Sequence, residues 1–448
     1  MNQAPASLDS PTPTLRPAPV AGEERIAALD VVRGLAVLGI LVMNIVEFAH
    51  PFEAYDNPAY AGGSSGPSLW TWFVQAVAFD GKMRALFSML FGAGLVLIDE
   101  RMQRKGQGER AADYLLRRCL WLVPFGVVHR FGLQWSGDIL YQYGLLGALA
   151  VAFRRLRART LILLGAATLA ILVPIGLFGY AKNVRLRAQA AEAVRLEQAG
   201  EKPGEDLAAA RKRWETRLAS IPPKPETVAK EVQAMRGGYA AVFAHRWDYH
   251  HTFQSAYLYY YFVWDVLGMM FLGMGLMKLG FFAGRAPLRV HEALLGGGLL
   301  AAAAVTWWAR TWWQTGFSPA AIGLSAIRQS TYSFSRALIA LAWASALLLV
   351  VRAGVLRWLT LALRAVGQMA FSNYVLQTIC CSLLFFGYGL GWYGRLSRAQ
   401  LMGVVLAVSL LQIGVSLVWL RHYRFGPLEW AWRSLTYWQR QPMRQAPV

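Results

Sequence analysis

Four polar residues with helical spacing could do chemistry inside a membrane. Asp30, Arg33, Asn44 and Glu47 lie in an otherwise mostly apolar stretch, residues 25–47, that is long enough to cross a bilayer. Their spacing places them on one stripe of a helix, with about 16 Å of apolar helix between Arg33 and Asn44. We therefore expect Asp30 and Arg33 to bind substrate near one face of the membrane, and Asn44 near the other. The alternative is an interfacial ion pair and an amide that joins neighbouring helices.

Three residues could act in proton transfer. His129 ends one apolar stretch and Asp138 begins the next, after the short turn FGLQWSG. A carboxylate beside an imidazole fixes its tautomer and raises its basicity, so this pair is a candidate general base with its orienting group. His50 follows the first apolar stretch on the same side and is the other candidate base. The alternatives are an interfacial histidine, a helix N-terminal aspartate favoured by the helix dipole, and an inert loop histidine.

Further polar residues could bind a substrate. Arg84 follows a break in the apolar pattern at Asp80, and could hold a phosphate or carboxylate or else pair with Asp80. Asn373 and Gln377 lie one helical turn apart, where they could line a substrate path or hydrogen-bond neighbouring helices. Asp265, in an apolar stretch, is predicted to be a functional group or the counter-ion of a buried arginine.

The composition predicts a membrane protein. Apolar residues make up 56% of the 448 residues, and several apolar stretches are long enough to span a bilayer. The net charge is +20, but most Lys and Arg lie between the apolar stretches, where they set membrane orientation, so nucleic-acid binding is not predicted. No disulfide framework or metal site is predicted, because the three cysteines lack ligand spacing and no carboxylate or cysteine is placed to complete a site with the histidines of 245–251.

The elements that must position these residues are predicted to form an all-α, polytopic membrane bundle of about ten transmembrane helices. The expected spans lie near residues 27–49, 69–99, 117–133, 138–153, 160–180, 254–278, 291–309, 333–351, 366–387 and 400–420. The second span contains Asp80-Gly81-Lys82 and is expected to be broken there, beside a cavity. The Lys and Arg of the connections predict that both termini are cytoplasmic.

The chain is predicted to divide into five parts. These are a disordered tail (1–24), an N-terminal bundle of five spans (25–180), an extracytoplasmic helical insertion (181–253), a C-terminal bundle of five spans (254–425), and a cytoplasmic amphipathic helix with a tail (426–448). The insertion carries basic residues, which does not conflict with this orientation because long loops translocate largely regardless of charge.

Several motifs resemble those of the YeiB family of bacterial inner-membrane proteins. The resemblance rests on ALDVVRGLAVLGILVMNI, DGKMRALFSMLFGAG, HRFGLQWSGDILY, GQMAFSNYVLQT, FFGYGLGWYGRLS and RFGPLEWAWRSLTY. It covers nearly the whole chain except the tail and the insertion. It implies a multi-pass protein of the bacterial inner membrane, in contact with membrane lipids.

The first predicted helix is also similar to that of transmembrane acyltransferases, including heparan-alpha-glucosaminide N-acetyltransferase. In related acyltransferase-3 proteins a His follows the Arg by eleven residues, whereas here Arg33 is followed at that distance by Asn44. The glucosaminide branch resembles this chain in having Arg and then Asn, with its His in the outer loop, for which His50 is the nearest counterpart. The resemblance implies transfer of an acyl group from cytosolic acyl-CoA, such as acetyl-CoA, to an acceptor on the far side.

The expected function is therefore that of a transmembrane acyltransferase, with His129 or His50 as the base and a lipid or glycan as the acceptor. The alternative is a transporter or lipid-handling protein without covalent chemistry, in which the polar residues line a translocation path. The third reading is a structural or assembly role, in which the insertion and the C-terminal helix would be the working surfaces. Separately, a homodimer is the candidate oligomeric state.

Overall fold

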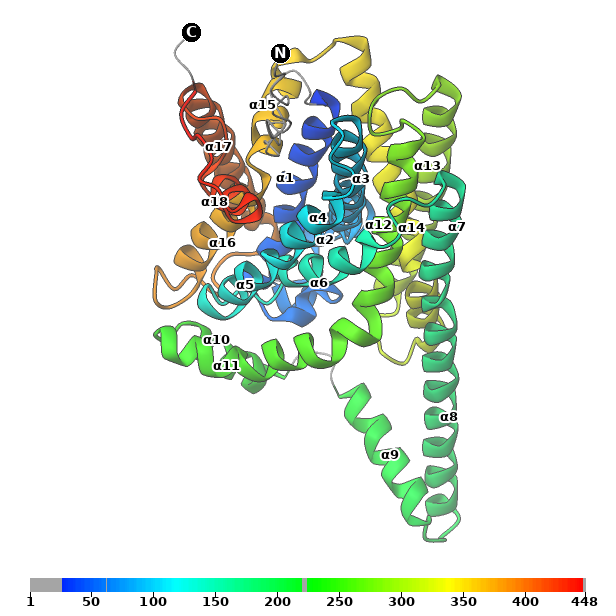
Figure 1. The fold of residues 1–448 in the computed structure, drawn as a ribbon. Helices are drawn as coiled ribbons and strands as arrows, with labels where there is room; N and C mark the ends of the chain where they lie inside the picture. Colours follow the sequence, from blue (N-terminus) through cyan, green and yellow to red (C-terminus); the bar gives the residue numbers. More distant parts are fainter. Residues whose placement is uncertain (1–25, 62, 220–223, 446–448) are drawn as a thin grey trace, which may run out of the picture.

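The computed structural model describes residues 26–61, 63–219 and 224–445. Over these residues it is all-helical apart from one isolated β-bridge between Tyr423 and Arg444, which confirms the predicted fold class (Figure 1). The α-helices are α1 (Ala27–Ala49), α2 (Gly66–Val74), α3 (Lys82–Arg104), α4 (Ala111–Leu120), α5 (Leu122–Val127), α6 (Leu140–Val151), α7 (Ala158–Ala170), α8 (Leu172–Gln198), α9 (Glu205–Leu218), α10 (Pro225–Met235), α11 (Tyr239–Thr252), α12 (Val263–Lys278), α13 (Leu288–Gln314), α14 (Ile322–Ala353), α15 (Arg357–Gln368), α16 (Ala370–Phe385), α17 (Arg398–His422) and α18 (Pro427–Tyr437). The π-helices are η4 (Gln75–Phe79), η5 (Val128–Gly132) and η6 (Phe253–Phe262), and the 3-10 helices are η2 (Phe52–Tyr55) and η3 (Pro58–Ala61).

Seven helices of the described chain are long and apolar enough to cross a membrane. They are Ala27–Ala49, Gly66–Arg104, Ala158–Gln198, Tyr239–Lys278, Leu288–Gln314, Ile322–Ala353 and Arg398–His422. The predicted count of about ten is therefore not confirmed. Two of the other expected spans are the shorter apolar helices α6 and α16, and the third is divided into α4, α5 and η5. Pro124 near the start of α5 lacks the N–H that would continue the hydrogen bonding of α4.

The predicted break in the second span is confirmed. Helix α2 continues into η4, the chain turns at Asp80 and Gly81, and α3 begins at Lys82. Gly81 has a φ of 69°, a left-handed conformation that residues with a Cβ rarely adopt. Lys82 Nζ donates to the Ala76 carbonyl at 2.5 Å, and the Tyr332 hydroxyl donates to Asp80 at 2.9 Å. The break is thus stabilised from both sides.

Helices α1 and α15 pack in direct backbone contact. A Cβ added to Gly34 would overlap the Leu363 carbonyl, and one added to Gly367 would overlap the Asp30 carbonyl. Small residues allow this close approach between helices in a membrane, where dispersion rather than water exclusion drives packing. The contact fixes the beginning of α1 beside the break between α15 and α16.

The region between α7 and α12 extends beyond the bundle. In Figure 1 the second half of α8 and all of α9 project at the bottom of the view, while α10 and α11 lie across that end of the bundle. Arg246 of α11 donates to the Gln134 carbonyl at 2.9 Å and to the Glu47 carbonyl at 3.3 Å. Helix α11 therefore holds the C-terminal part of α1 against the turn that precedes α6.

Candidate functional site

The two polar pairs of α1 line two different pockets. Asp30 and Arg33 line a pocket of about 180 Å³, and Asn44 and Glu47 line one of about 750 Å³. We name them the arginine pocket and the aromatic pocket, after the side chains described below. Arg33 donates to Asp30 at 2.8 Å, so the ion pair expected from their spacing is present and borders a cavity.

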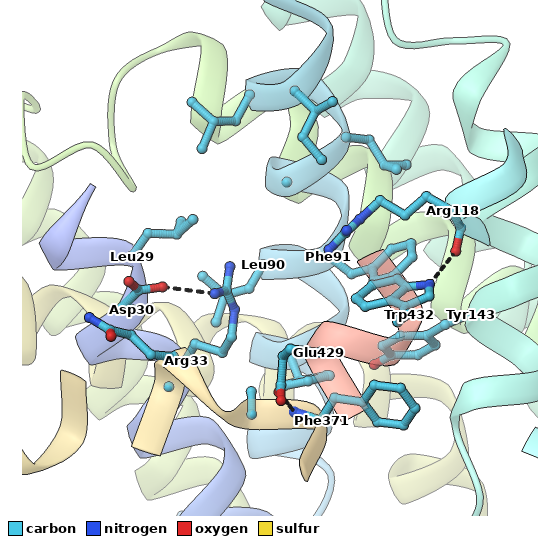
Figure 2. Close-up of a pocket in the computed structure, with 18 of the residues that line it drawn as sticks. Leu29, Asp30, Arg33, Leu90, Phe91, Arg118, Tyr143, Phe371, Glu429 and Trp432 are labelled. Carbon is cyan, nitrogen blue, oxygen red and sulfur yellow. Dashed lines mark hydrogen bonds and ion pairs between the residues drawn. The ribbon is translucent and has the colours of Figure 1, made fainter. Parts of the chain in front are cut away.

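The arginine pocket carries an excess of positive charge. Its charged lining residues are Asp30, Arg33, Arg101, Arg118, Glu429 and Arg433. The Arg118 guanidinium lies 3.6 Å from the centroid of the Trp432 ring, and Trp432 Nε1 donates to the Arg118 carbonyl at 2.7 Å, as Figure 2 shows for the latter bond. Among the described residues no carboxylate pairs with Arg118. Its charge is therefore available to a phosphate or carboxylate group.

The C-terminal helix α18 forms part of the wall of the arginine pocket. Its Glu429 accepts from the backbone N–H group of Phe371 at 2.6 Å, as Figure 2 shows. It also accepts from the Ser372 N–H group at 3.2 Å and from the Ser372 hydroxyl at 2.5 Å. Burial raises the pKa of Glu429, which these hydrogen bonds oppose. An acidic group at a helix N-terminus compensates its unpaired N–H groups. Helix α18 thereby fixes the beginning of α16.

The aromatic pocket is lined mostly by rings and ionic groups. Thirteen of its thirty lining residues are aromatic, and four are aliphatic. Arg328 of α14 pairs with Asp56 at 2.8 Å and with Asp80 at 3.2 Å. On another wall, Arg84 pairs with Asp265 at 3.1 Å. Asp265 also pairs with the fully buried Arg336. Asp265 is thus the counter-ion of two arginines, one of them fully buried, and a counter-ion role was one of the two readings of the sequence.

The His129–Asp138 pair adjoins the place where the two pockets approach each other. His129 Nδ1 lies 2.8 Å from Asp138 Oδ1, and Nε2 lies 2.8 Å from Thr378 Oγ1. The His129 ring packs edge-on against Tyr374, with centroids 5.0 Å apart. Tyr374 lines both pockets, and Asp138 lines the aromatic pocket. A carboxylate, an imidazole and a hydroxyl therefore form one buried hydrogen-bonded chain beside this junction.

Local structure explains how this chain is held. His129 lies in the π-helix η5, a widened turn that is frequent at functional sites. Asp138 accepts from the N–H groups of Leu140 at 3.1 Å and Tyr141 at 3.0 Å, so it also caps α6. Because the carboxylate accepts hydrogen bonds, it favours the tautomer with the proton on Nδ1 of His129 and leaves Nε2 as the acceptor.

Besides His129, which lines neither pocket itself, three of the predicted site residues lie outside both pockets. His50 Nε2 bonds to the Leu396 carbonyl at 2.8 Å, and burial lowers the pKa of His50 to about 4, so this ring is neutral and held by the loop before α17. Asn373 donates to Ser416 Oγ at 2.9 Å. Gln377 donates to the Val37 carbonyl at 3.0 Å and to Gln412 at 3.1 Å. Both amides thus join α16 to its neighbouring helices, which was the alternative to lining a path.

Four residues of the site were not predicted from the sequence, namely Tyr374, Thr378, Arg118 and Trp432. Tyr374 and Thr378 lie one turn apart in the polar stretch that contains Asn373 and Gln377, and this spacing was the available signal. In the sequence, Arg118 is only one of several basic residues in a connection between spans, and Trp432 is only part of a predicted amphipathic helix. Their contact joins residues 314 positions apart, which no local pattern predicts.

These features define a class of protein: a polytopic membrane protein with charged cavities between its helices. Residues 276–439 match the family described as "Protein of unknown function (DUF418)". The chain is 31% identical over 434 residues to the uncharacterized protein YeiB of Escherichia coli (strain K12), covering 92% of this chain and 96% of that protein. It is 28% identical over 455 residues to the uncharacterized protein YxaH of Bacillus subtilis (strain 168), covering 95% and 97%.

The chain therefore belongs to the YeiB family. No solved structure matches it.

Proposed function

We propose that this protein is a membrane acyltransferase that carries an acyl group from cytosolic acyl-CoA to an acceptor at the outer face of a bacterial inner membrane. One observation carries the proposal: Tyr374 borders both pockets and packs against His129, which is bonded to Asp138. A base with its orienting carboxylate thus adjoins the junction between a cationic cavity and a separate aromatic one.

The arginine pocket suits the donor. Its arginines would bind the phosphates of acyl-CoA, for which the guanidinium fork is well shaped. Nine of its twenty-five lining residues are aliphatic, which suits an acyl chain. Asp30 and Arg33 of α1 would form one edge of this donor site, and Arg118 with Trp432 another.

The proposed reaction is a single acyl transfer. The acceptor hydroxyl or amine would attack the thioester carbonyl carbon, and the carbon–sulfur bond would break as the new carbon–oxygen or carbon–nitrogen bond forms. His129 Nε2 would take the acceptor proton, and the departing thiolate would receive a proton from the imidazolium. Because Nε2 bonds to Thr378 at rest, the ring must exchange this bond for the acceptor group.

The orientation is part of the proposal. Ile26, which precedes α1, and Tyr437 of α18 line the arginine pocket, while Arg246 of the insertion contacts the opposite end of α1. The connections richest in Lys and Arg would then face the cytoplasm together with the donor site. Single cysteines introduced at Gln233 and at Gln103 would test this orientation. A thiol-labelling reagent would be added separately from each side of the membrane, in sealed cells and in vesicles.

Acyl transfer is tested with the protein in nanodiscs and acetyl-CoA carrying a labelled acetyl group. We expect CoA release, transfer or slow hydrolysis with the wild type and its loss in His129→Gln. His245→Gln is the matched control, since His245 is exposed and lines neither pocket. Absence of CoA binding, release and transfer in the wild type would overturn the proposal, as would equal activity in the two variants.

Transport without covalent chemistry is the second candidate. It is favoured by the ionic groups along the aromatic pocket, where Arg328 bridges Asp56 and Asp80 and Arg84 pairs with Asp265. Such intramembrane charges often line substrate or ion paths. A flux that persists in His129→Gln and stops in Arg84→Met would favour this candidate over acyl transfer.

A further inference from the structure

The two pockets differ in the apolar surface that they offer. The arginine pocket has nine aliphatic and seven aromatic side chains among its twenty-five lining residues. The larger aromatic pocket has four aliphatic and thirteen aromatic side chains among thirty. A cavity for hydrocarbon chains needs no excess of rings over aliphatic side chains. The excess therefore indicates a ligand with flat apolar faces.

One buried amide oxygen of the aromatic pocket lacks a hydrogen-bond partner, and a second amide lines the same pocket. Gln142 is only 2% exposed and donates to the Asp138 carbonyl at 3.2 Å, but its Oε1 accepts from no described group. Asn44 is half-buried and lines the same pocket, where its amide can both donate and accept. Buried polar groups without partners are costly, so a ligand that donates and accepts hydrogen bonds here would bind favourably.

We propose that the aromatic pocket binds a saccharide and, resting on the proposed function, that this saccharide is the acyl acceptor. The C–H faces of a sugar ring stack on aromatic side chains, and its hydroxyls both donate and accept, as Asn44 and Gln142 require. The volume of about 750 Å³ lies in the range of small-molecule sites. Because Gln142 and Asp138 share this lining with Tyr374, a bound hydroxyl would lie near His129.

Two sources share this chemistry, a free saccharide and the sugar headgroup of a glycolipid. Binding is measured by calorimetry in nanodiscs, because glycoside detergents would themselves occupy the site. The probes are glucose, galactose and N-acetylglucosamine, then monoglucosyl diacylglycerol built into the disc, with discs of phosphatidylglycerol alone as the blank. Preference for the free or the lipid-linked sugar identifies the source.

Asn44→Leu and Gln142→Leu each remove one polar partner, and we expect each to weaken saccharide binding at least about tenfold. Gln233→Leu is the matched control, since Gln233 is exposed and lines neither pocket. Size-exclusion profiles and melting curves identify any variant that misfolds. If one of the two leucine variants misfolds, the affinity of the other tests the proposal. Failure of all the saccharide probes to bind the wild type, or equal affinity in the three variants, would overturn the proposal.

The outcomes separate this inference from the proposed function. Saccharide binding without any transfer of label from acetyl-CoA would refute acyl transfer and leave the saccharide site standing. Transfer of label to an acceptor that is not a sugar, in a protein that binds no saccharide, would refute the saccharide site and leave acyl transfer standing.

Discussion

Replacing Asp138 by asparagine should abolish most of the proposed acyl transfer while leaving the fold intact. Asp138 accepts from His129 Nδ1 at 2.8 Å and from two backbone N–H groups that begin α6. The amide oxygen of asparagine can still accept from the Tyr141 N–H, but its NH₂ group would then face both His129 Nδ1 and the Leu140 N–H, which share Oδ1 as their acceptor. The imidazole proton would move to Nε2, and the ring could no longer take a proton from an acceptor through that atom.

The two consequences differ in size. Losing the general base costs about 10²- to 10⁴-fold in rate. The hydrogen bond from the Tyr141 N–H survives, but the Leu140 N–H loses its acceptor, so the free energy of unfolding should fall by about 1–3 kcal/mol. The assay is single-turnover release of CoA from labelled acetyl-CoA in nanodiscs, read beside a melting curve of the same sample.

Asp113→Asn is the matched control. Asp113 pairs with Arg117 on an exposed face of α4, at 2.6 Å, and lines neither pocket. A turnover rate in Asp138→Asn equal to that of the control would refute the role assigned to the His129–Asp138 pair. A large loss of stability with no added loss of rate would assign Asp138 to helix capping alone.

Three further predictions concern charges elsewhere. Arg118→Met should weaken acyl-CoA binding about tenfold to a hundredfold by calorimetry, with saccharide binding unchanged, because it removes a charge-assisted bond. Asp265→Leu should cost about 3–5 kcal/mol of unfolding free energy, measured by denaturant titration, because it leaves Arg84 and Arg336 without their carboxylate. Burial raises the pKa of Glu429, so the folded protein binds this proton more tightly than the unfolded chain does. The resulting contribution to the free energy of unfolding is complete below pH 4.5 and is lost as the pH rises through the raised pKa. In Glu429→Gln this part of the pH dependence of the melting temperature should disappear.

The helical periodicity of the first span predicted which of its polar residues line the two pockets. The stripe from Asp30 to Asn44 follows from 3.6 residues per turn, and both ends of it reach a cavity. His129 and Asp138 were paired correctly because only a short turn separates them, so few conformations keep them apart. The break at Gly81 was also local, since charged residues interrupted an apolar pattern there.

Partners that lie far apart in the chain could not be predicted in this way. Pairing with nearby Asp80 was one of the two readings of Arg84, but Arg84 pairs with Asp265, while Asp80 pairs with Arg328. Thr378 reaches His129 across 249 residues. Ion pairs of this kind depend on which helices become neighbours, and apolar patterns specify the existence of helices more closely than their arrangement.

The carboxylate of Glu429 has a consequence for biogenesis. Translation delivers α16 to the membrane before the ribosome has made the residue that satisfies its first amide groups. A chain cut short before Gly426 would still present every long apolar helix to the insertion machinery, yet it would lack the wall that Trp432 and Glu429 supply. Reporter fusions placed upstream of α18 would therefore register correct insertion in molecules whose arginine pocket never assembles.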